Sequence, residues 1–427
     1  MHPGHPGDPT PGGTIEANSL RRADRRTTAR RASLARNGNF ILLWAGQFVS
    51  QLGDRLAMVA LPWLVYRATG SALSTGIAFA LYTLPYVLFG TVAGVLIDRL
   101  DKRHVMIASD IARVALVMLV PVAAERSLVA VYVLSFLIAS AGVFFDPCKL
   151  AILPDLVPQQ KLMRANSFLA TGENLTEIVG YTLAGFTLAA ISTTNAFRLD
   201  AATFAVSAAS LALIRYRAPV REAAEAAASS FWRELREGFS FLAHHRGLLV
   251  NTVMVVGCVA GLGASYPLAF LLAVRVFDAG TAAFGVFEGV IGAGYLAGSL
   301  ALAALATRVP QGRAMVAGLV VMGASLCLVA AAGGVWIACV PFAVLGVANA
   351  AALIAIDTYL QSAVPEQLRG RVFGTRFTLT QGVYALAVLA GGALATVVDV
   401  QVLFIVCGLL IAVPALGGLF VREIRDA

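Results

Sequence analysis

Residues 74–123 read STGIAFALYTLPYVLFGTVAGVLIDRLDKRHVMIASDIARVALVMLVPVA, and the rest of the chain repeats their pattern. Two apolar runs, 74–97 and 105–123, are each about as long as a helix that crosses a bilayer, which needs roughly 20 residues. The short stretch between them is rich in Asp, Lys and Arg. This alternation predicts two membrane-spanning helices joined by a short polar loop.

The composition of the whole chain fits a membrane protein. Apolar side chains make up 59% of the 427 residues and charged ones 13%, too few polar groups to cover a water-soluble molecule of this size. The net charge of +8 comes from basic clusters between apolar runs, as cytoplasmic loops require, so we do not expect nucleic-acid binding. The five cysteines are scattered singly and have no metal-ligand or redox spacing.

Extending this reading predicts an all-α integral membrane protein with twelve transmembrane helices. The first six spans are 40–66, 74–97, 105–123, 128–145, 165–191 and 196–214. The second six are 248–274, 282–306, 314–332, 335–358, 372–397 and 401–420. A charged linker separates the two groups, and its segment 231–242 has the apolar spacing of an amphipathic helix that lies on a membrane surface.

The spans divide the chain into two six-helix bundles with polar flanks. The expected parts are a disordered basic tail, an N-terminal bundle, a cytoplasmic linker, a C-terminal bundle and a short tail, at 1–38, 39–214, 215–247, 248–421 and 422–427. Similar residues follow the fourth and tenth spans, VPQQKL and VPEQL. This similarity suggests two pseudo-symmetric halves, an arrangement used by carriers that rock around a central site.

Orientation follows from the distribution of Lys and Arg among the loops. One set of alternate loops contains most of them, in the tail, the linker and at Arg99, Lys102, Arg103, Lys149, Lys161, Arg164, Arg308, Arg313, Arg369, Arg371, Arg422 and Arg425. The opposite set contains only Arg67, Arg126, Arg198 and Arg275. Because positive loops stay in the cytoplasm, we expect a multi-pass protein of the cell inner membrane with both termini cytoplasmic.

Four charged residues inside the predicted spans are candidates for the transport pathway. Asp54 and Arg55 lie midway along the first span, where each charge costs roughly 2.5 to 3.5 kcal/mol, so they should face the bundle interior. They either balance charges on neighbouring helices or take part in transport, with Asp54 carrying a proton. Glu173 and Glu177 lie one turn apart in the fifth span. They either bind a cationic cargo group, carry a proton, or are neutralised by an Arg of another helix.

Other charges in the spans have supporting roles in this interpretation. Asp110 and Arg113 share one face of the third span, where they pair with each other or with the loop that follows span two. Glu288 lies near the outer end of its span and is a weaker cargo candidate, because it can reach water. Arg371 and Arg376 at the start of the eleventh span complete the predicted charge network.

The loop after the second span resembles the signature of the major facilitator superfamily. That signature reads G-x-L-x-D-R-x-G-R-[KR], and the matching residues here are Gly94, Asp98, Arg99, Lys102 and Arg103, with Asp101 where the family usually has Gly. In the family this loop forms a cytoplasmic latch between the two halves. The resemblance implies that Asp98, Arg99 and Arg103 hold the inner ends of helices two and eleven together, with Arg371 or Arg376 as partners.

Further stretches are similar to the branch that contains macrolide-efflux and enterobactin-exporter proteins, at 47–55, 61–71, 147–158 and 165–167. The resemblance implies a twelve-helix carrier that exports small molecules, commonly coupled to proton entry. We therefore expect a monomeric, proton-coupled secondary exporter of drug-, macrolide- or siderophore-like amphipathic or cationic molecules, working in the lipid bilayer by alternating access.

Three alternatives remain open: an importer, a lipid translocator of the same fold, or a sensor or scaffold that transports nothing. An enzyme is not expected, because the sequence contains no phosphate-binding loop, no Ser/His/Asp arrangement and no His or Cys ligand cluster. We likewise expect no cofactor and no metal.

Overall fold

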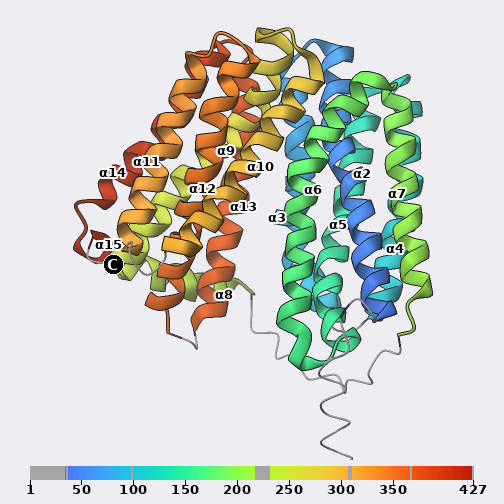
Figure 1. The fold of residues 1–427 in the computed structure, drawn as a ribbon, viewed down its shortest axis with the longest axis horizontal. Coiled ribbons are helices and arrows are strands. Elements are labelled where there is room, and N and C mark those ends of the chain that lie inside the picture. Colours follow the sequence, from blue (N-terminus) through green and yellow to red (C-terminus); the bar gives the residue numbers. More distant parts are fainter. Residues whose placement is uncertain are drawn as a thin grey trace, which may run out of the picture.

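The computed structural model describes residue 34 and residues 37–97, 100–216, 231–305, 310–365 and 368–425. These ranges are helical and contain no β-strand (Figure 1). The first half consists of α2 (Gly38–Thr69), α3 (Ala72–Ile97), α4 (Lys102–Ala124), α5 (Leu128–Leu156), α6 (Leu162–Ala190) and α7 (Thr193–Leu213). The second half consists of α9 (Arg246–Leu271), α10 (Gly280–Leu305), α11 (Gln311–Ala330), α12 (Val335–Ala363), α13 (Arg369–Leu394) and α14 (Val400–Gly418).

These twelve long helices form two bundles that stand side by side (Figure 1). Ten of those in the described ranges are long and apolar enough to cross a membrane. The other two, α2 and α6, have 32 and 29 residues and run alongside the rest. Both contain the charged pairs singled out above, which lower the mean hydropathy of their central turns.

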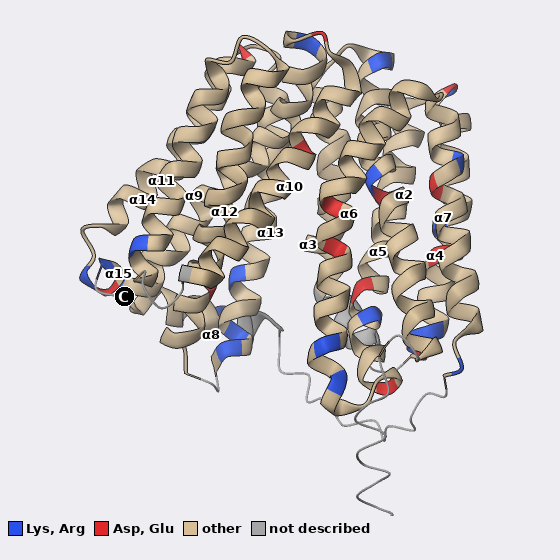
Figure 2. Cartoon of the chain, in the orientation of Figure 1, with Lys and Arg blue, Asp and Glu red and all other residues tan. Residues whose placement is uncertain are grey.

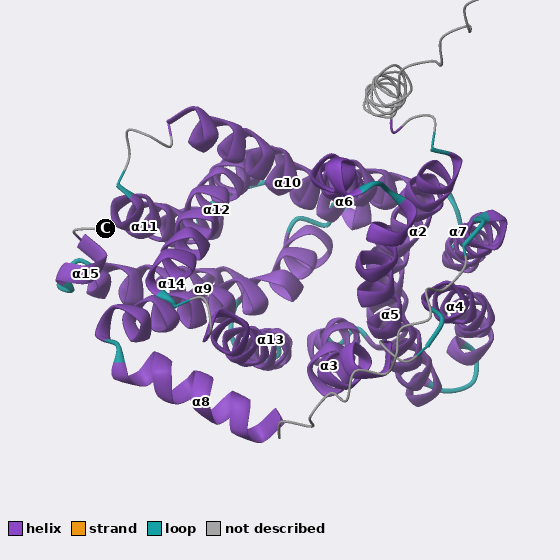
Figure 3. Cartoon of the chain, turned by 90° about the horizontal axis from the view of Figure 1, so that it is seen from below, coloured by secondary structure: helices purple, strands orange, loops and turns teal. Residues whose placement is uncertain are grey.

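Most of the contact between the described parts of the two halves is made by two pairs of helices, α6 with α10 and α3 with α13 (Figure 3). Glycines allow both pairs to approach at backbone distance. A Cβ atom on Gly185 would lie 2.6 Å from the Thr281 carbonyl oxygen, and one on Gly76 would lie 2.8 Å from the Gly392 Cα. Small residues at such crossings are typical of helices packed within a bilayer.

The fourth predicted span was placed too short. It was expected to end at residue 145, whereas α5 continues through Leu156. Pro147 and Pro154 lie inside the helix, where membrane proteins tolerate them because neighbouring groups satisfy the freed carbonyls. The extension places Lys149, a loop cation in the sequence-based prediction, inside the N-terminal bundle.

The segment with amphipathic spacing forms α8 (Phe231–His244), which lies across α9 and α13 at one end of the molecule (Figure 3). Arg371 of α13 donates to Glu237 of α8 at 2.6 Å. A short final helix, α15 (Arg422–Arg425), follows α14 and contacts α9 and α11.

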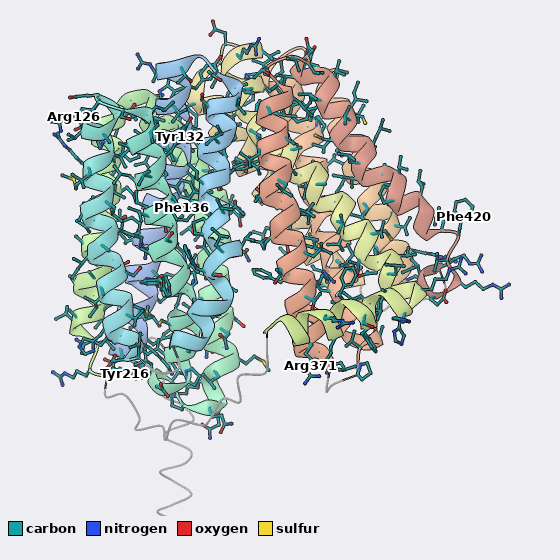
Figure 4. All side chains as sticks on the ribbon, turned by 180° about the vertical axis from the view of Figure 1, so that it is seen from behind. Arg126, Tyr132, Phe136, Tyr216, Arg371 and Phe420 are labelled. Atoms are coloured by element: carbon teal, nitrogen blue, oxygen red, sulfur yellow. The ribbon has the colours of Figure 1, made fainter. Side chains whose placement is uncertain are left out.

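The described Lys and Arg residues are unevenly distributed along the helices (Figure 2). Many lie at the end of the molecule that carries α8, where Tyr216 and Arg371 are also found (Figure 4). We call this the α8 end. Arg126 lies at the opposite end, here called the Arg126 end (Figure 4).

Candidate transport cavity

A cavity of about 690 Å³ lies between the two halves. Its charged lining comes from four helices of the N-terminal half, and consists of Asp54, Arg55, Arg113, Asp146, Lys149, Glu173 and Glu177. Gln381 and Tyr384 of α13 line it from the other half. A second cavity of about 570 Å³ shares Tyr86, Asp146 and Gln381 with the first and reaches Arg371, so the two together extend to the α8 end.

At the Arg126 end the halves are closed by aromatic contacts. The hydroxyl groups of Tyr181 on α6 and Tyr266 on α9 are 3.0 Å apart and share a hydrogen bond. The ring of Phe79 on α3 stands edge-on to the rings of Tyr266 and Phe270, with centroid distances of 4.9 and 6.0 Å. It is tilted against the ring of Phe284, whose centroid lies 6.4 Å away. Because these rings come from both halves, they shut the cavity on this side and leave it open toward the α8 end.

Arg55 joins the cavity to this closure. Its guanidinium donates to the Tyr181 hydroxyl at 3.2 Å and lies 5.0 Å from the centre of that ring. A cation–π contact of this kind adds to the hydrogen bond. The predicted pathway residue therefore bonds directly to the side chain that bridges the two halves.

Asp54 belongs to a charge cluster deeper in the N-terminal half. Arg113 of α4 lies 2.6 Å from Asp110 on the same helix and 4.0 Å from Asp54. The predicted pairing of Asp110 with Arg113 is thus present, and Asp110 is its nearer partner. The guanidinium also stacks over Phe204 and Phe145, 4.2 and 4.8 Å from their centres, which fixes its place between α4, α5 and α7.

Lys149 neutralises one of the two candidate glutamates. Its ammonium lies 2.7 Å from Glu173 of α6 and 3.7 Å from Asp146, one turn earlier on α5. Tyr86 of α3 donates to Asp146 at 3.0 Å. The geometry therefore favours the alternative in which a basic residue of another helix neutralises the Glu173 carboxylate. That residue is a lysine, whereas the sequence-based hypothesis named an arginine.

Glu177 differs from its neighbour. It is exposed in the cavity wall beside Asn174, and among the described residues its carboxylate has no hydrogen bond or ion pair. Glu288 on α10, weighed as a weaker candidate, is not part of this lining. Glu177 is thus the carboxylate of this lining that has no hydrogen bond or ion pair to a described residue, and it interacts electrostatically with Arg55 across the cavity.

The predicted latch is only partly described. Asp98 and Arg99 lie outside the described residues, as do the surroundings of Gly94. Lys102 bonds to Asp155 at 3.2 Å and to the Ala151 carbonyl oxygen at 2.7 Å.

The other latch and partner side chains also bond within their own half. Arg103 donates to the carbonyl oxygens of Leu211 and Ala212. On the other side, Arg371 pairs with Glu237, and Arg376 with Asp357 at 2.7 Å. No ion pair between described residues therefore holds the halves together at the α8 end, and the latch itself stays a prediction.

Asp101, which replaces the family's usual glycine, has a local role that the signature did not indicate. Its side chain accepts hydrogen bonds from the backbone N–H groups of Arg103 and His104 and so caps the start of α4. An aspartate in this position stabilises a helix N-terminus through both hydrogen bonding and the helix dipole.

Sequence reasoning missed three charged residues of this region. Asp146 and Lys149 were placed beyond the end of a span, and Asp200 of α7 was passed over, although an acidic residue inside an apolar run is itself a signal. Within the described ranges, no three or more His, Cys, Asp or Glu residues are arranged to hold a metal ion. The charged and polar side chains of the lining can form ion pairs and hydrogen bonds with groups that enter the cavity.

The whole sequence and fold are similar to those of known transporters. Relatives include the uncharacterized MFS-type transporter YfiS of Bacillus subtilis, 28% identical over 90% of this chain and 93% of that protein. Macrolide efflux protein A of Streptococcus pyogenes is 24% identical over 90% of this chain and 96% of that protein. The multidrug efflux pump Tap of Mycolicibacterium fortuitum is 24% identical over 92% of this chain and 97% of that protein.

Solved structures with a similar fold include a bacterial homologue of the iron transporter ferroportin in an inward-facing state. It has a TM-score of 0.73 and 15% identity over 91% of this chain and 99% of that one. The nucleoside transporter NupG has a TM-score of 0.74 and 13% identity over 89% of this chain and 99% of that one. The family of transmembrane secretion effectors, MFS_3, matches residues 30–425. The chain is a multi-pass membrane transporter of the major facilitator type and belongs to this family.

Proposed function

We propose that the protein exports small amphipathic or cationic molecules from the cytoplasm and that proton entry drives the export. The observation that carries the proposal is the cavity between the halves, which reaches the α8 end, is shut at the Arg126 end, and contains an unpaired carboxylate at Glu177. Relatives named macrolide efflux protein A and multidrug efflux pump Tap support an export direction.

The lining matches an amphipathic cation better than an anion. The polar part of the cavity has four carboxylates against three basic groups, and Lys149 and Arg113 already have carboxylate partners. The second cavity adds Val87, Val143 and Phe377, against which an apolar part of the cargo would pack. Pockets of this kind bind mainly through apolar contact and use a few polar groups for orientation.

Charge distribution supports the orientation that export requires. Loops rich in Lys and Arg are retained in the cytoplasm, which supports an orientation with the α8 end and both termini inside and the Arg126 end outside the plasma membrane. In this orientation the cavity faces inward. Alternating access then requires the α8 end to close and the aromatic contacts at the Arg126 end to separate, with Asp98 and its basic neighbours latching the closed inner side.

The test is the accumulation of fluorescent lipophilic cations and macrolides in efflux-deficient bacteria. We expect lower accumulation in cells that express the wild type, and loss of that effect with a protonophore. Glu177→Gln should remove export of cations while retaining export of neutral compounds, because only the cations need the carboxylate. Glu125→Gln is the matched control, since Glu125 is exposed and far from the cavity lining.

Two outcomes would contradict the proposal. Raised accumulation in cells that express the wild type would indicate an importer. Unchanged accumulation of every compound, with expression in the membrane verified, would remove the support for this cargo class and favour another cargo such as a lipid.

A further inference from the structure

Three carboxylates and one guanidinium share a buried region between α2, α4 and α7. The carboxylates belong to Asp54, Asp110 and Asp200, and the guanidinium is that of Arg113. Asp110 and Asp200 are almost fully buried, at 0 and 1% exposure. If every carboxylate were ionised, the cluster would have two negative charges more than positive ones, and two of its three carboxylates are buried away from water.

Asp200 is the member without a partner. Among the described residues, neither of its carboxylate oxygens has a hydrogen-bond partner, whereas Asp110 accepts from Arg113 at 2.6 Å. The Asp200 side chain points at α2: a Cβ on Gly53 would lie 2.6 Å from Asp200 Oδ1. Gly53 directly precedes Asp54, so the close crossing of α2 and α7 brings the two carboxylates to the same place.

A buried carboxylate without a hydrogen bond or a cation is unstable as an anion. The groups that face it supply little compensation. Arg113 is held by Asp110 and by the two aromatic rings, Asp54 is itself acidic, and Tyr82 of α3 is uncharged at neutral pH. A proton bound to Asp200 removes this charge without any rearrangement.

We propose that Asp200 is a proton-binding site of this transporter, occupied while the cavity faces the α8 end. Two bound protons make the cluster neutral, and Asp200 holds one of them. Asp54 connects the site to water, because its side chain is 36% exposed and lines the cavity. On release, the Asp200 O–H bond breaks, the proton passes by way of Asp54 to cavity water, and the remaining carboxylate requires Arg113 to turn toward it.

Such a turn would link proton release to helix movement. Arg113 would approach Asp200 by loosening its bond to Asp110 within α4, and a new bond to Asp200 would then join α4 to α7. The link to transport rests on the proposed function above. The presence of the proton on Asp200 does not, and it can be measured separately.

Infrared spectroscopy of the purified protein in lipid nanodiscs tests the site directly. A protonated carboxyl group gives a C=O stretching band distinct from that of a carboxylate. At neutral pH we expect Asp200→Asn to reduce this band by the intensity of one carboxyl group, and Glu125→Gln to leave it unchanged. Asp200→Thr, which is also neutral and smaller, should give the same loss and serves if the first variant does not fold. An equal band in the wild type and both variants would overturn the proposal.

Transport assays separate this inference from the proposed function. If the band is lost in Asp200→Asn but the wild type exports nothing in response to a proton gradient, the site stands and the proposed function fails. If the wild type exchanges cargo for protons and the band is unaffected by the substitution, the function stands and the assignment to Asp200 fails. If both hold, Asp200→Asn should retain downhill cargo movement and lose its response to the proton gradient.

Discussion

Gly285→Ala is expected to shift the protein away from the conformation that is closed at the Arg126 end. Gly285 of α10 faces α6, and a Cβ at this position would lie 2.5 Å from the Tyr181 carbonyl oxygen and 3.0 Å from the Gly185 Cα. Both are backbone atoms, so neither can rotate away, and the two helices must separate. Overpacking of this kind costs about 1–3 kcal/mol, which corresponds to roughly a 5- to 150-fold change in the ratio of the two conformations.

Distances between spin labels at positions 163 and 363 measure this shift. Both positions are exposed near the α8 end, one in each half, so their separation reports whether the cavity is open there. We expect Gly285→Ala to increase the population with the shorter distance. Gly417→Ala is the control, because no atom lies within 4 Å of the Cβ it would add. An unchanged distance distribution in a folded Gly285→Ala protein would refute the idea that this contact holds the conformation.

Three further substitutions test the charge cluster, the cavity and the helix cap. Arg113→Met should lower the free energy of unfolding by about 3–5 kcal/mol, because it leaves the Asp110 carboxylate buried without a cation. Thermal unfolding in detergent should show this loss as a lower Tm. An unchanged Tm would mean that Asp110 is already neutral. Lys149→Ala should cost less than about 1 kcal/mol in stability, because its partner Glu173 is partly exposed. The substitution should also tighten binding of a fluorescent lipophilic cation, because Glu173 then has no ion pair with Lys149. Weaker binding would contradict the role given to the cavity carboxylates. Asp101→Ala should lower the free energy of unfolding by about 1 kcal/mol, because α4 loses its N-terminal cap. Asp101→Asn should stay near the wild type in the same unfolding assay. Equal losses in both variants would rule out capping as the cause.

Much of the architecture could be predicted because membrane burial leaves a strong signal in sequence. A helix must be about twenty apolar residues long to cross the bilayer, so each span is visible in one dimension. Charged residues within spans are costly, and that cost pointed to Asp54, Arg55, Glu173 and Glu177, all of which line the central cavity. The fold and the membership of the major facilitator type were therefore predicted correctly.

The sequence does not show which side chains lie next to each charged residue in the membrane. Hydropathy says that a residue lies in the membrane but not which helix it faces, so the partnership of Lys149 with Glu173 was not foreseen. The prolines of α5 added to the error, because proline ends helices in water and is accommodated within them in a bilayer. Asp200 gives a signal as an acidic residue inside an apolar run, but its position beside α2 and Asp54 appears only in the packing of α7.

The most direct test of the account uses purified protein in liposomes that contain a pH-sensitive dye, with tetraphenylphosphonium as the cargo. For a proton-coupled exporter we expect a proton gradient to move the cation in the direction opposite to the protons, a gradient of the cation to move protons in return, and Glu177→Gln to stop both movements. Cation movement that is independent of the proton gradient and causes no change in internal pH would contradict this expectation.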